Sequence, residues 1–313
     1  MSALPETCPN CRRGQLIAQP TSFTLRTVLQ RWEVVRRRPF SPELWAEYAE
    51  AADRTITLHR CGHCAMQWFL PLVTGTERFY REITEDEYYH ADKWEFRRAA
   101  RDLKRAGRSR VLDIGCGSGG FLASLRDRTG IVGTGFEFNA ALLPQVAAQG
   151  LGTLADLNDP AVFGSFDAIT VFQVIEHSAD PMALMDQLDR LLAPGGTYIL
   201  AVPDMDGPIR HFREALTDNP PHHVSRWGRP AMLALGEARG YLLRYITTEW
   251  LPRYLWGMYL PTMVTAAQWP FDLGETLLRH GRLERLIRLL ERTPLHELPG
   301  VPGHSLYAVF EKR

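Results

Sequence analysis

Short apolar runs alternate with amphipathic segments through the centre of the chain, between residues 110 and 202. The runs predict β-strands at residues 110–114, 131–136, 166–172 and 197–202, with a weaker pattern near 151–154. Apolar positions with the 3.6-residue period predict helices near residues 119–128, 139–149 and 181–192. Strands separated by helices are typical of an α/β domain, in which a parallel sheet carries helices on both faces.

A glycine-rich turn follows the first of these strands. Asp113 stands two positions before Gly115, and Gly117, Gly119 and Gly120 complete the turn before a helical pattern begins. Glycines let backbone N–H groups approach a ligand closely, and the N-terminus of the following helix adds a partial positive charge. Ligands of open parallel sheets bind beyond the carboxyl ends of the strands. The turn therefore predicts a site for a nucleotide-like cofactor.

Two cofactors fit this turn. Gly115, Gly117 and Gly120 satisfy the Gly-x-Gly-x-x-Gly pattern and Glu137 ends the second strand, which permits a nicotinamide dinucleotide. Three features favour S-adenosylmethionine instead. They are Asp113 before the turn, the apolar segment that ends in Val-Ile-Glu-His at residues 174–177, and Ala-Pro-Gly-Gly at residues 193–196.

Four of the five cysteines form two Cys-x-x-Cys pairs, Cys8 with Cys11 and Cys61 with Cys64. Each pair has the spacing that presents two thiolates to one metal, so the two pairs predict a four-thiolate structural zinc site. The spacer between the pairs is long, and Ser41 to Tyr48 predicts a capped helix inserted in a zinc-ribbon-like segment. Unligated thiols, redox pairs, or His63 as a replacement ligand are the alternatives.

Composition describes an ordinary globular chain, with 45% hydrophobic and 23% charged residues and a net charge of zero. Residues 1–110 contain 19 Lys and Arg against 14 Asp and Glu, a mild asymmetry. The start of the chain lacks the apolar core of a signal peptide, and no apolar run is long enough to span a bilayer. We therefore expect a cytoplasmic protein, with peripheral membrane contact as an alternative.

Taken together, these motifs resemble the class I S-adenosylmethionine-dependent methyltransferases, in particular the bacterial subgroup with an N-terminal zinc-binding segment. The resemblance rests on the cysteine pairs, the glycine turn, Val-Ile-Glu-His-x-x-Asp-Pro and Pro-Gly-Gly. It extends to Tyr88-Tyr89, to Pro-His-His-Val-Ser-Arg-Trp at residues 221–227, and to the closing apolar strand at 303–310. It implies a Rossmann-like seven-stranded sheet with helices on both faces and an antiparallel last strand.

The resemblance also implies roles for single residues in binding the cofactor. Gly115, Gly117 and Gly119 would line its methionine portion, where Asp113 would help hold the amino group. Glu137 would accept both ribose hydroxyls. The remaining positions are Asp156 and Leu157 beside the adenine, Gln173 at the methionine end, and Cys116, which would offer its backbone.

Transfer to an oxygen requires removal of the acceptor's proton, and histidine is the usual base near neutral pH. His222 and His223 follow the fifth strand on the ligand side of the sheet and are the candidate bases. A structural hydrogen bond that fixes their loop is the alternative. Glu176 and His177, at the end of the fourth strand, are further candidates for either role.

The resemblance divides the chain into five parts. Residues 1–75 are the zinc-binding segment, 76–109 a linker and leading helix, 110–250 the cofactor domain, 251–300 a helical cap, and 301–313 the final strand. The cap has an apolar start and then Arg282, Arg285 and Arg288 opposite a leucine-rich face. It predicts a cover over the active site or, alternatively, a surface at 251–273 that contacts a membrane or a lipid-linked substrate.

The sequence thus predicts a methyltransferase that acts on a small molecule or a glycan precursor, with O-methylation favoured and with S-adenosylmethionine and structural zinc as cofactors. One alternative is an RNA methyltransferase in which the zinc segment and Arg36-Arg37-Arg38 grip phosphates, which the neutral overall charge disfavours. Another is a cofactor-binding scaffold without catalysis. The dehydrogenase stays open as a further alternative.

Overall fold

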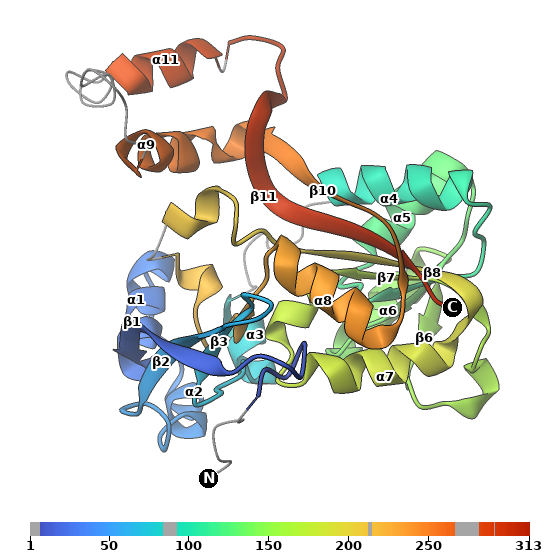
Figure 1. Cartoon of the computed structure of the whole chain (residues 1–313), viewed down its shortest axis with the longest axis horizontal. Helices are drawn as coiled ribbons and strands as arrows, with labels where there is room; N and C mark the ends of the chain where they lie inside the picture. The colour runs from blue at the N-terminus through green and yellow to red at the C-terminus, as the bar shows by residue number, and fades with distance from the viewer. Residues whose placement is uncertain (1–6, 84–92, 212–214, 267–281, 291) are drawn as a thin grey trace.

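Seven strands form one mixed sheet in the order β10-β11-β8-β7-β4-β5-β6 (Figure 1). The computed structural model describes residues 7–83, 93–211, 215–266, 282–290 and 292–313. The strands are β4 (Val111–Ile114), β5 (Thr134–Phe136), β6 (Gly152–Leu154), β7 (Phe166–Phe172), β8 (Leu192–Pro203), β10 (Leu242–Pro252) and β11 (Glu297–Glu311). Neighbouring strands from β6 to β8 run parallel, whereas β11 is antiparallel to both β8 and β10. This confirms the predicted seven-stranded sheet with an antiparallel last strand.

Helices cover both faces of the sheet. The helices are α4 (Trp94–Arg105), α5 (Gly120–Thr129), α6 (Leu143–Ala148), α7 (Pro181–Leu191) and α8 (Arg229–Arg239), with short 3-10 turns η1 (Ala140–Leu142) and η2 (Pro160–Val162). Apolar side chains of α4 and α5 pack on one face with Val111 and Ile199, and those of α7 and α8 pack on the other with Leu112 and Leu200. Because both faces are covered, nearly all residues of the central strands β4 and β7 are buried, which explains their uninterrupted apolar runs in the sequence.

The N-terminal segment forms a second, four-stranded sheet in the order β1-β2-β3-β9. Its elements are β1 (Leu16–Thr24), β2 (Thr55–Cys61), β3 (Gln67–Leu70), α1 (Leu25–Arg36), α2 (Pro42–Glu47) and α3 (Glu77–Ile83). The helix predicted from Ser41 is α2, since the Ser41 side chain accepts a hydrogen bond from the Leu44 N–H at 3.2 Å and Pro42 occupies the first turn. An aromatic core that includes Trp32 and Phe79 joins these helices to the small sheet.

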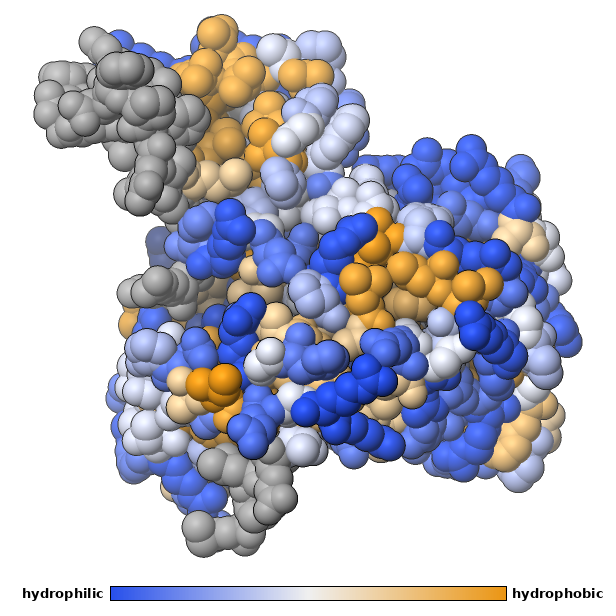
Figure 2. Space-filling model, viewed as in Figure 1, coloured by the Kyte–Doolittle hydropathy of each residue, from blue (hydrophilic) through white to orange (hydrophobic). Residues whose placement is uncertain are grey.

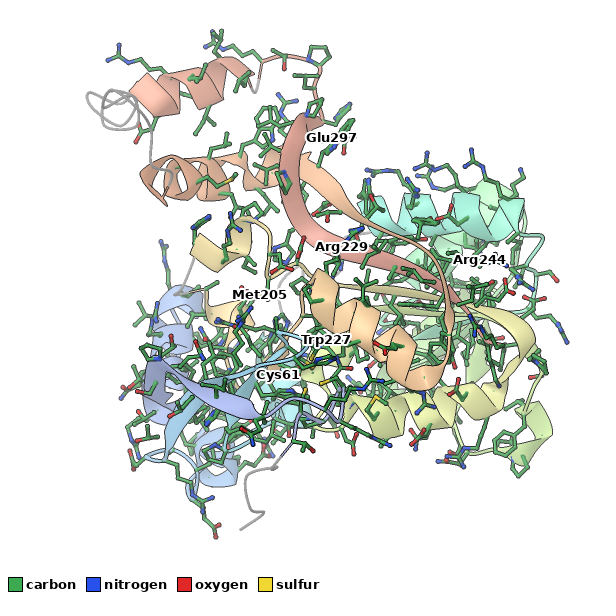
Figure 3. All side chains as sticks on the ribbon, viewed as in Figure 1. Cys61, Met205, Trp227, Arg229, Arg244 and Glu297 are labelled. Atoms are coloured by element: carbon green, nitrogen blue, oxygen red, sulfur yellow. The ribbon has the colours of Figure 1, made fainter. Side chains whose placement is uncertain are left out.

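The strand β9 (Ser225–Arg226) connects the two sheets. In the sequence it lies between β8 and β10 of the large sheet, yet it pairs with β3 of the small sheet. Its Ser225 lies opposite Trp68, and the Phe69 N–H donates to the carbonyl of Val224 at 3.0 Å. Cys61 and Trp227 belong to one buried apolar cluster, and Figure 3 shows them between the small sheet and α8. The N-terminal segment is therefore packed directly onto the central domain.

The C-terminal insertion lies at the tip of the long β10–β11 ribbon (Figure 1). It contains η6 (Arg253–Leu255), α9 (Trp256–Ala266) and α11 (Arg282–Leu290), and it packs against η4 (Pro208–His211) through a small cluster around Trp256. The cap was predicted at residues 251–300. Strand β10 ends at Pro252 and strand β11 begins at Glu297, so the two strands include the first and last residues of the predicted cap. Figure 2 shows apolar residues gathered over this part of the molecule.

Some predictions concern residues that the structure does not describe. Tyr88-Tyr89 and Trp269 to Phe271 lie outside the described residues, as do the side chains of Arg282 and Leu283. Within the described ranges, no helix is both long enough and apolar enough to cross a membrane.

Candidate functional site

The glycine turn links β4 to α5 at the carboxyl edge of the parallel strands. Gly115, Gly117 and Gly119 have φ values of 69°, 54° and 89°, a backbone conformation that residues other than glycine rarely adopt. A Cβ atom on Gly115 would lie 2.4 Å from the Val174 side chain. The turn thus needs glycine both for its backbone shape and for the close approach of the loop after β7.

Glu137 holds this turn against the end of β5. One carboxylate oxygen accepts a hydrogen bond from the Gly117 N–H at 2.8 Å, and the other accepts from the Asn139 N–H at 3.0 Å. Each carboxylate oxygen can accept more than one hydrogen bond. The side chain is partly exposed, so it can also accept hydroxyl groups of a ligand bound at the turn.

Asp113 is buried below the turn, with 3% of its surface exposed. The Thr170 hydroxyl donates to its carboxylate at 2.6 Å. Burial and, to a smaller extent, the charge of Glu137 raise the pKa of Asp113 to about 7, against the Thr170 hydrogen bond. Glu137 and, when it is ionised, Asp113 give the site a negative potential that a cationic ligand would neutralise.

The other predicted cofactor residues lie on neighbouring loops. Asp156 follows β6 and is exposed, and it accepts from the Asn158 N–H at 2.8 Å, while Leu157 is buried. The Cys116 N–H donates to the carbonyl of Phe136 at 3.1 Å, and burial raises the pKa of the Cys116 thiol, which disfavours a thiolate nucleophile. Gln173 has a φ of 55° and its N–H donates to the carbonyl of Ala201 at 2.8 Å.

Two buried glutamates near Gln173 were missed by the sequence analysis. Glu95 of α4 interacts with Gln173, and burial raises the pKa of Glu95. Glu249 of β10 accepts from the N–H groups of His304 and Ser305 at 2.8 and 3.0 Å, and burial together with the charge of Glu95 raises its pKa to about 7. Their one sequence signal is an acid at an otherwise buried position, which cannot be recognised before the fold is known.

The candidate bases His222 and His223 lie in the loop between η5 (Leu216–Asp218) and β9, and both are buried. His177 lies beside them at the end of η3 (Ile175–His177), with ring centroids 4.5 to 4.7 Å apart among the three. Burial lowers the pKa of His222 and His223 well below the usual range. It lowers the pKa of His177 to about 4, against the opposing effect of the His222 and Gln173 carbonyls. All three imidazoles are therefore neutral at physiological pH.

Glu176 completes this group. It is 1% exposed, and neither of its carboxylate oxygens has a hydrogen-bond partner among the described residues. One oxygen lies 3.8 Å from Nε2 of His177 and 3.8 Å from Nε2 of His223. Burial raises the pKa of Glu176 to about 8. The structure thus gathers all four residues named as candidates for the acceptor chemistry.

The two cysteine pairs meet as predicted. Cys8 and Cys64 have their Sγ atoms 3.7 Å apart, those of Cys11 and Cys61 are 3.6 Å apart, and all four side chains are buried free thiols. A tetrahedral zinc site with bonds of about 2.3 Å has sulfur–sulfur distances of about 3.8 Å. The N–H groups of His63 and Cys64 point at the Cys61 sulfur, at 3.3 and 3.4 Å. The four thiols therefore fit a zinc ion.

Comparison with known proteins supports the assignment of the central domain. Residues 91–245 match a family model described as a methyltransferase domain. The ubiquinone biosynthesis O-methyltransferase of Xanthomonas campestris pv. campestris (strain B100) is 34% identical over 162 residues, which cover 43% of this chain and 66% of that protein. The enzyme of the same name from Xanthomonas oryzae pv. oryzae (strain PXO99A) is 35% identical over 102 residues, or 30% of this chain and 42% of its own length.

Among solved structures, an S-adenosylmethionine-dependent methyltransferase from Mesorhizobium loti is 16% identical, with a TM-score of 0.43 over 71% of this chain and all of that one. The chain spans less than half the length of the Xanthomonas oryzae enzyme and about two thirds of the Xanthomonas campestris enzyme. Residues 91–245 thus match a methyltransferase domain, and the strand order of the sheet is the one that the sequence resemblance implied.

Proposed function

We propose that the chain is an S-adenosylmethionine-dependent O-methyltransferase of a small molecule or glycan precursor. The observation that carries this proposal is the glycine turn held by Glu137 above the buried Asp113. Two similar proteins are named ubiquinone biosynthesis O-methyltransferases, which supports oxygen as the methylated atom and a small molecule as the acceptor.

S-adenosylmethionine, when bound, supplies a methyl group activated by a sulfonium centre. The chain's own residues orient it and the acceptor. Glu137 would accept the ribose hydroxyls, and Asp156 and Leu157 would flank the adenine. The carboxylate of Asp113 would attract the positive charges of the methionine portion, with Gly115, Gly119, Cys116 and Gln173 completing the site around it.

The acceptor must lose its proton, and we propose a histidine of the His222-His223 pair as the base. A neutral imidazole is the form that accepts a proton, and burial keeps both rings neutral. Both rings lie in one cluster with His177 and Glu176, which immediately follow β7 and Gln173. The glycine turn also follows the carboxyl end of a parallel strand, which supports a base on the cofactor side of the sheet.

The cap is the proposed source of acceptor specificity. Trp250, just before the cap, and Tyr254, within it, are 48% and 73% exposed, and Leu286 and Leu289 of α11 are exposed as well. These apolar side chains would suit a hydrophobic or lipid-linked acceptor and peripheral membrane contact through residues 251–273. In the N-terminal segment, we propose that zinc bound by Cys8, Cys11, Cys61 and Cys64 has a structural role.

The test is methyl transfer from radiolabelled S-adenosylmethionine to cell extract that has been separated into lipid, sugar, small-molecule and RNA fractions. The proposal expects label in the lipid, sugar or small-molecule fraction, bound so that it resists the treatments that release methyl esters. Label confined to RNA would overturn the choice of acceptor. Absence of labelling in every fraction, despite normal cofactor binding, would favour a scaffold without catalysis.

A further inference from the structure

The cluster of His177, His222, His223 and Glu176 has properties that a proton-accepting histidine does not require. Its three imidazoles and one carboxylate come from η3 and from the loop before β9, 45 residues further along the chain. One ring nitrogen from each histidine lies within 4.8 Å of those of the other two. A single base needs one imidazole near the acceptor, so the convergence of four groups calls for a different explanation.

Hydrogen bonds fix which nitrogen of each ring carries its hydrogen. Nδ1 of His177 lies 2.7 Å from the carbonyl oxygen of His222, and Nδ1 of His222 lies 2.8 Å from the carbonyl oxygen of Thr217. A carbonyl oxygen only accepts, so Nδ1 is the donor in both rings. Nδ1 of His223 lies 3.2 Å from a carboxylate oxygen of Asp218, which accepts in the same way. In the neutral ring, Nε2 then carries the lone pair.

The carboxylate of Glu176 faces two of these lone pairs. Its oxygen lies 3.8 Å from Nε2 of both His177 and His223, and neither nitrogen has a hydrogen to donate to it. A buried polar group without a partner is costly, and a buried charge more so. The carboxylate of Glu176 has no hydrogen-bond partner and no cationic side chain at hydrogen-bond distance among the described residues. A cation between the carboxylate and the ring nitrogens would satisfy the whole group.

We propose that His177, His222, His223 and Glu176 bind a divalent transition-metal ion, with zinc as the preferred metal. Imidazole nitrogens and a carboxylate are ligands that zinc accepts, whereas magnesium and calcium prefer oxygen alone. Tetrahedral zinc with bonds of about 2.0–2.1 Å has ligand atoms about 3.3 Å apart, so the 3.8 Å distances need to shorten by about 0.5 Å.

The groups behind the ligands have the arrangement usual for metal-binding histidines. Such histidines donate their second ring N–H to a backbone carbonyl or a carboxylate, which fixes the ring orientation. His177 and His222 use backbone carbonyls for this purpose, and His223 uses Asp218. An Nε2 lone pair that binds an ion cannot accept a proton, so metal bound by these rings would replace the histidine base proposed above and leave the proposed methyl transfer itself unchanged.

The experiment measures metal in the full-length chain, purified without chelators, and needs no turnover. Elemental analysis should find an ion in addition to the one expected at the four cysteines. Cobalt added to protein whose cysteine site holds zinc should give visible absorption without thiolate-to-cobalt charge-transfer bands. A wild-type chain that binds metal only at the thiolates would overturn the proposal, whatever the variants do.

Variants locate the site. His223→Ala and Glu176→Gln should each lose the cobalt signal, whereas His59→Ala, a histidine of β2 outside the cluster, should keep it. Asp218→Asn removes only the group behind His223 and should weaken metal binding about 10–100-fold. If His223→Ala does not fold, His177→Gln and Asp218→Asn serve the same purpose. Unchanged cobalt binding in the folded cluster variants would contradict the assignment. Calorimetry of cofactor binding on the same samples separates this failure from failure of the proposed function.

Discussion

Replacement of Glu137 by alanine tests the cofactor site most directly. The carboxylate anchors the turn through Gly117 and the start of the next loop through Asn139, and it is the proposed acceptor of both ribose hydroxyls. Hydrogen bonds to a charged group contribute about 1.5–3 kcal/mol each, so loss of two ribose contacts costs about 3–6 kcal/mol. At about 1.4 kcal/mol for each factor of ten, the Kd of the cofactor should rise about 100- to 10,000-fold.

Isothermal titration calorimetry with S-adenosylhomocysteine measures this change without turnover. Glu137→Gln is the informative companion, because its amide keeps one acceptor oxygen but turns an NH2 group toward a backbone N–H. We expect its Kd to lie between those of the wild type and Glu137→Ala. Glu237→Ala is the matched control, since Glu237 is an exposed glutamate that pairs with Arg13 far along the chain from the turn. Its Kd should stay unchanged, and all variants should retain their zinc.

The reasoning fails if Glu137→Ala is folded and binds S-adenosylhomocysteine within about threefold of the wild type, a difference of less than about 1 kcal/mol. That result would mean that the carboxylate shapes the turn without touching the ribose. Tighter binding of a nicotinamide dinucleotide than of S-adenosylhomocysteine by the wild type would refute the choice of cofactor itself.

Three further outcomes follow from single contacts. Because burial raises the pKa of Asp113 to about 7 and a cationic ligand favours its charged form, S-adenosylmethionine affinity should rise as pH increases through about 7, and Asp113→Asn should remove this dependence in calorimetry across pH. Cys61→Ser should lose the cysteine-bound zinc and lower Tm, as shown by elemental analysis and thermal denaturation, because the metal contributes to folding. Phe121→Ala removes a ring that packs against both Phe96 and Phe172, and it should lower the free energy of unfolding in urea by about 3–5 kcal/mol while zinc content is retained.

The centre of the parallel sheet could be predicted from the sequence because β4 and β7 are buried on both faces. Continuous apolar runs then mark strands directly, and β7 coincides with the predicted residues 166–172. The second strand shows the limit of this signal. It begins at Thr134 rather than at residue 131, because Val132 is 54% exposed and lies in the preceding loop. The apolar side chain of Val132 extended the hydrophobic pattern, so the strand was predicted to begin too early.

The connection between the two sheets could not be predicted from the sequence, because it depends on strand pairing between segments that are distant in the chain. The strand β9 has two residues and no hydrophobic pattern of its own, and only its partner β3 makes it a strand. The histidine cluster is similar. His177 and the His222-His223 pair stand far apart in the sequence, and no periodicity relates them. The sequence shows which histidines and acids the chain has, but only the tertiary structure brings them into one cluster.

The N-terminal segment and the histidine loop form one structural unit. Tyr80 of α3 places its hydroxyl 3.0 Å from Nδ1 of His177 and donates to the carbonyl of His222 at 3.2 Å. Trp32 and Phe79, from the core of the same segment, pack beside the His222 ring. The N-terminal segment therefore supplies part of the packing around the histidine loop. If zinc holds this segment as proposed, loss of the metal should also disturb the positions of His177 and His222, which links the N-terminal segment to the proposed acceptor site.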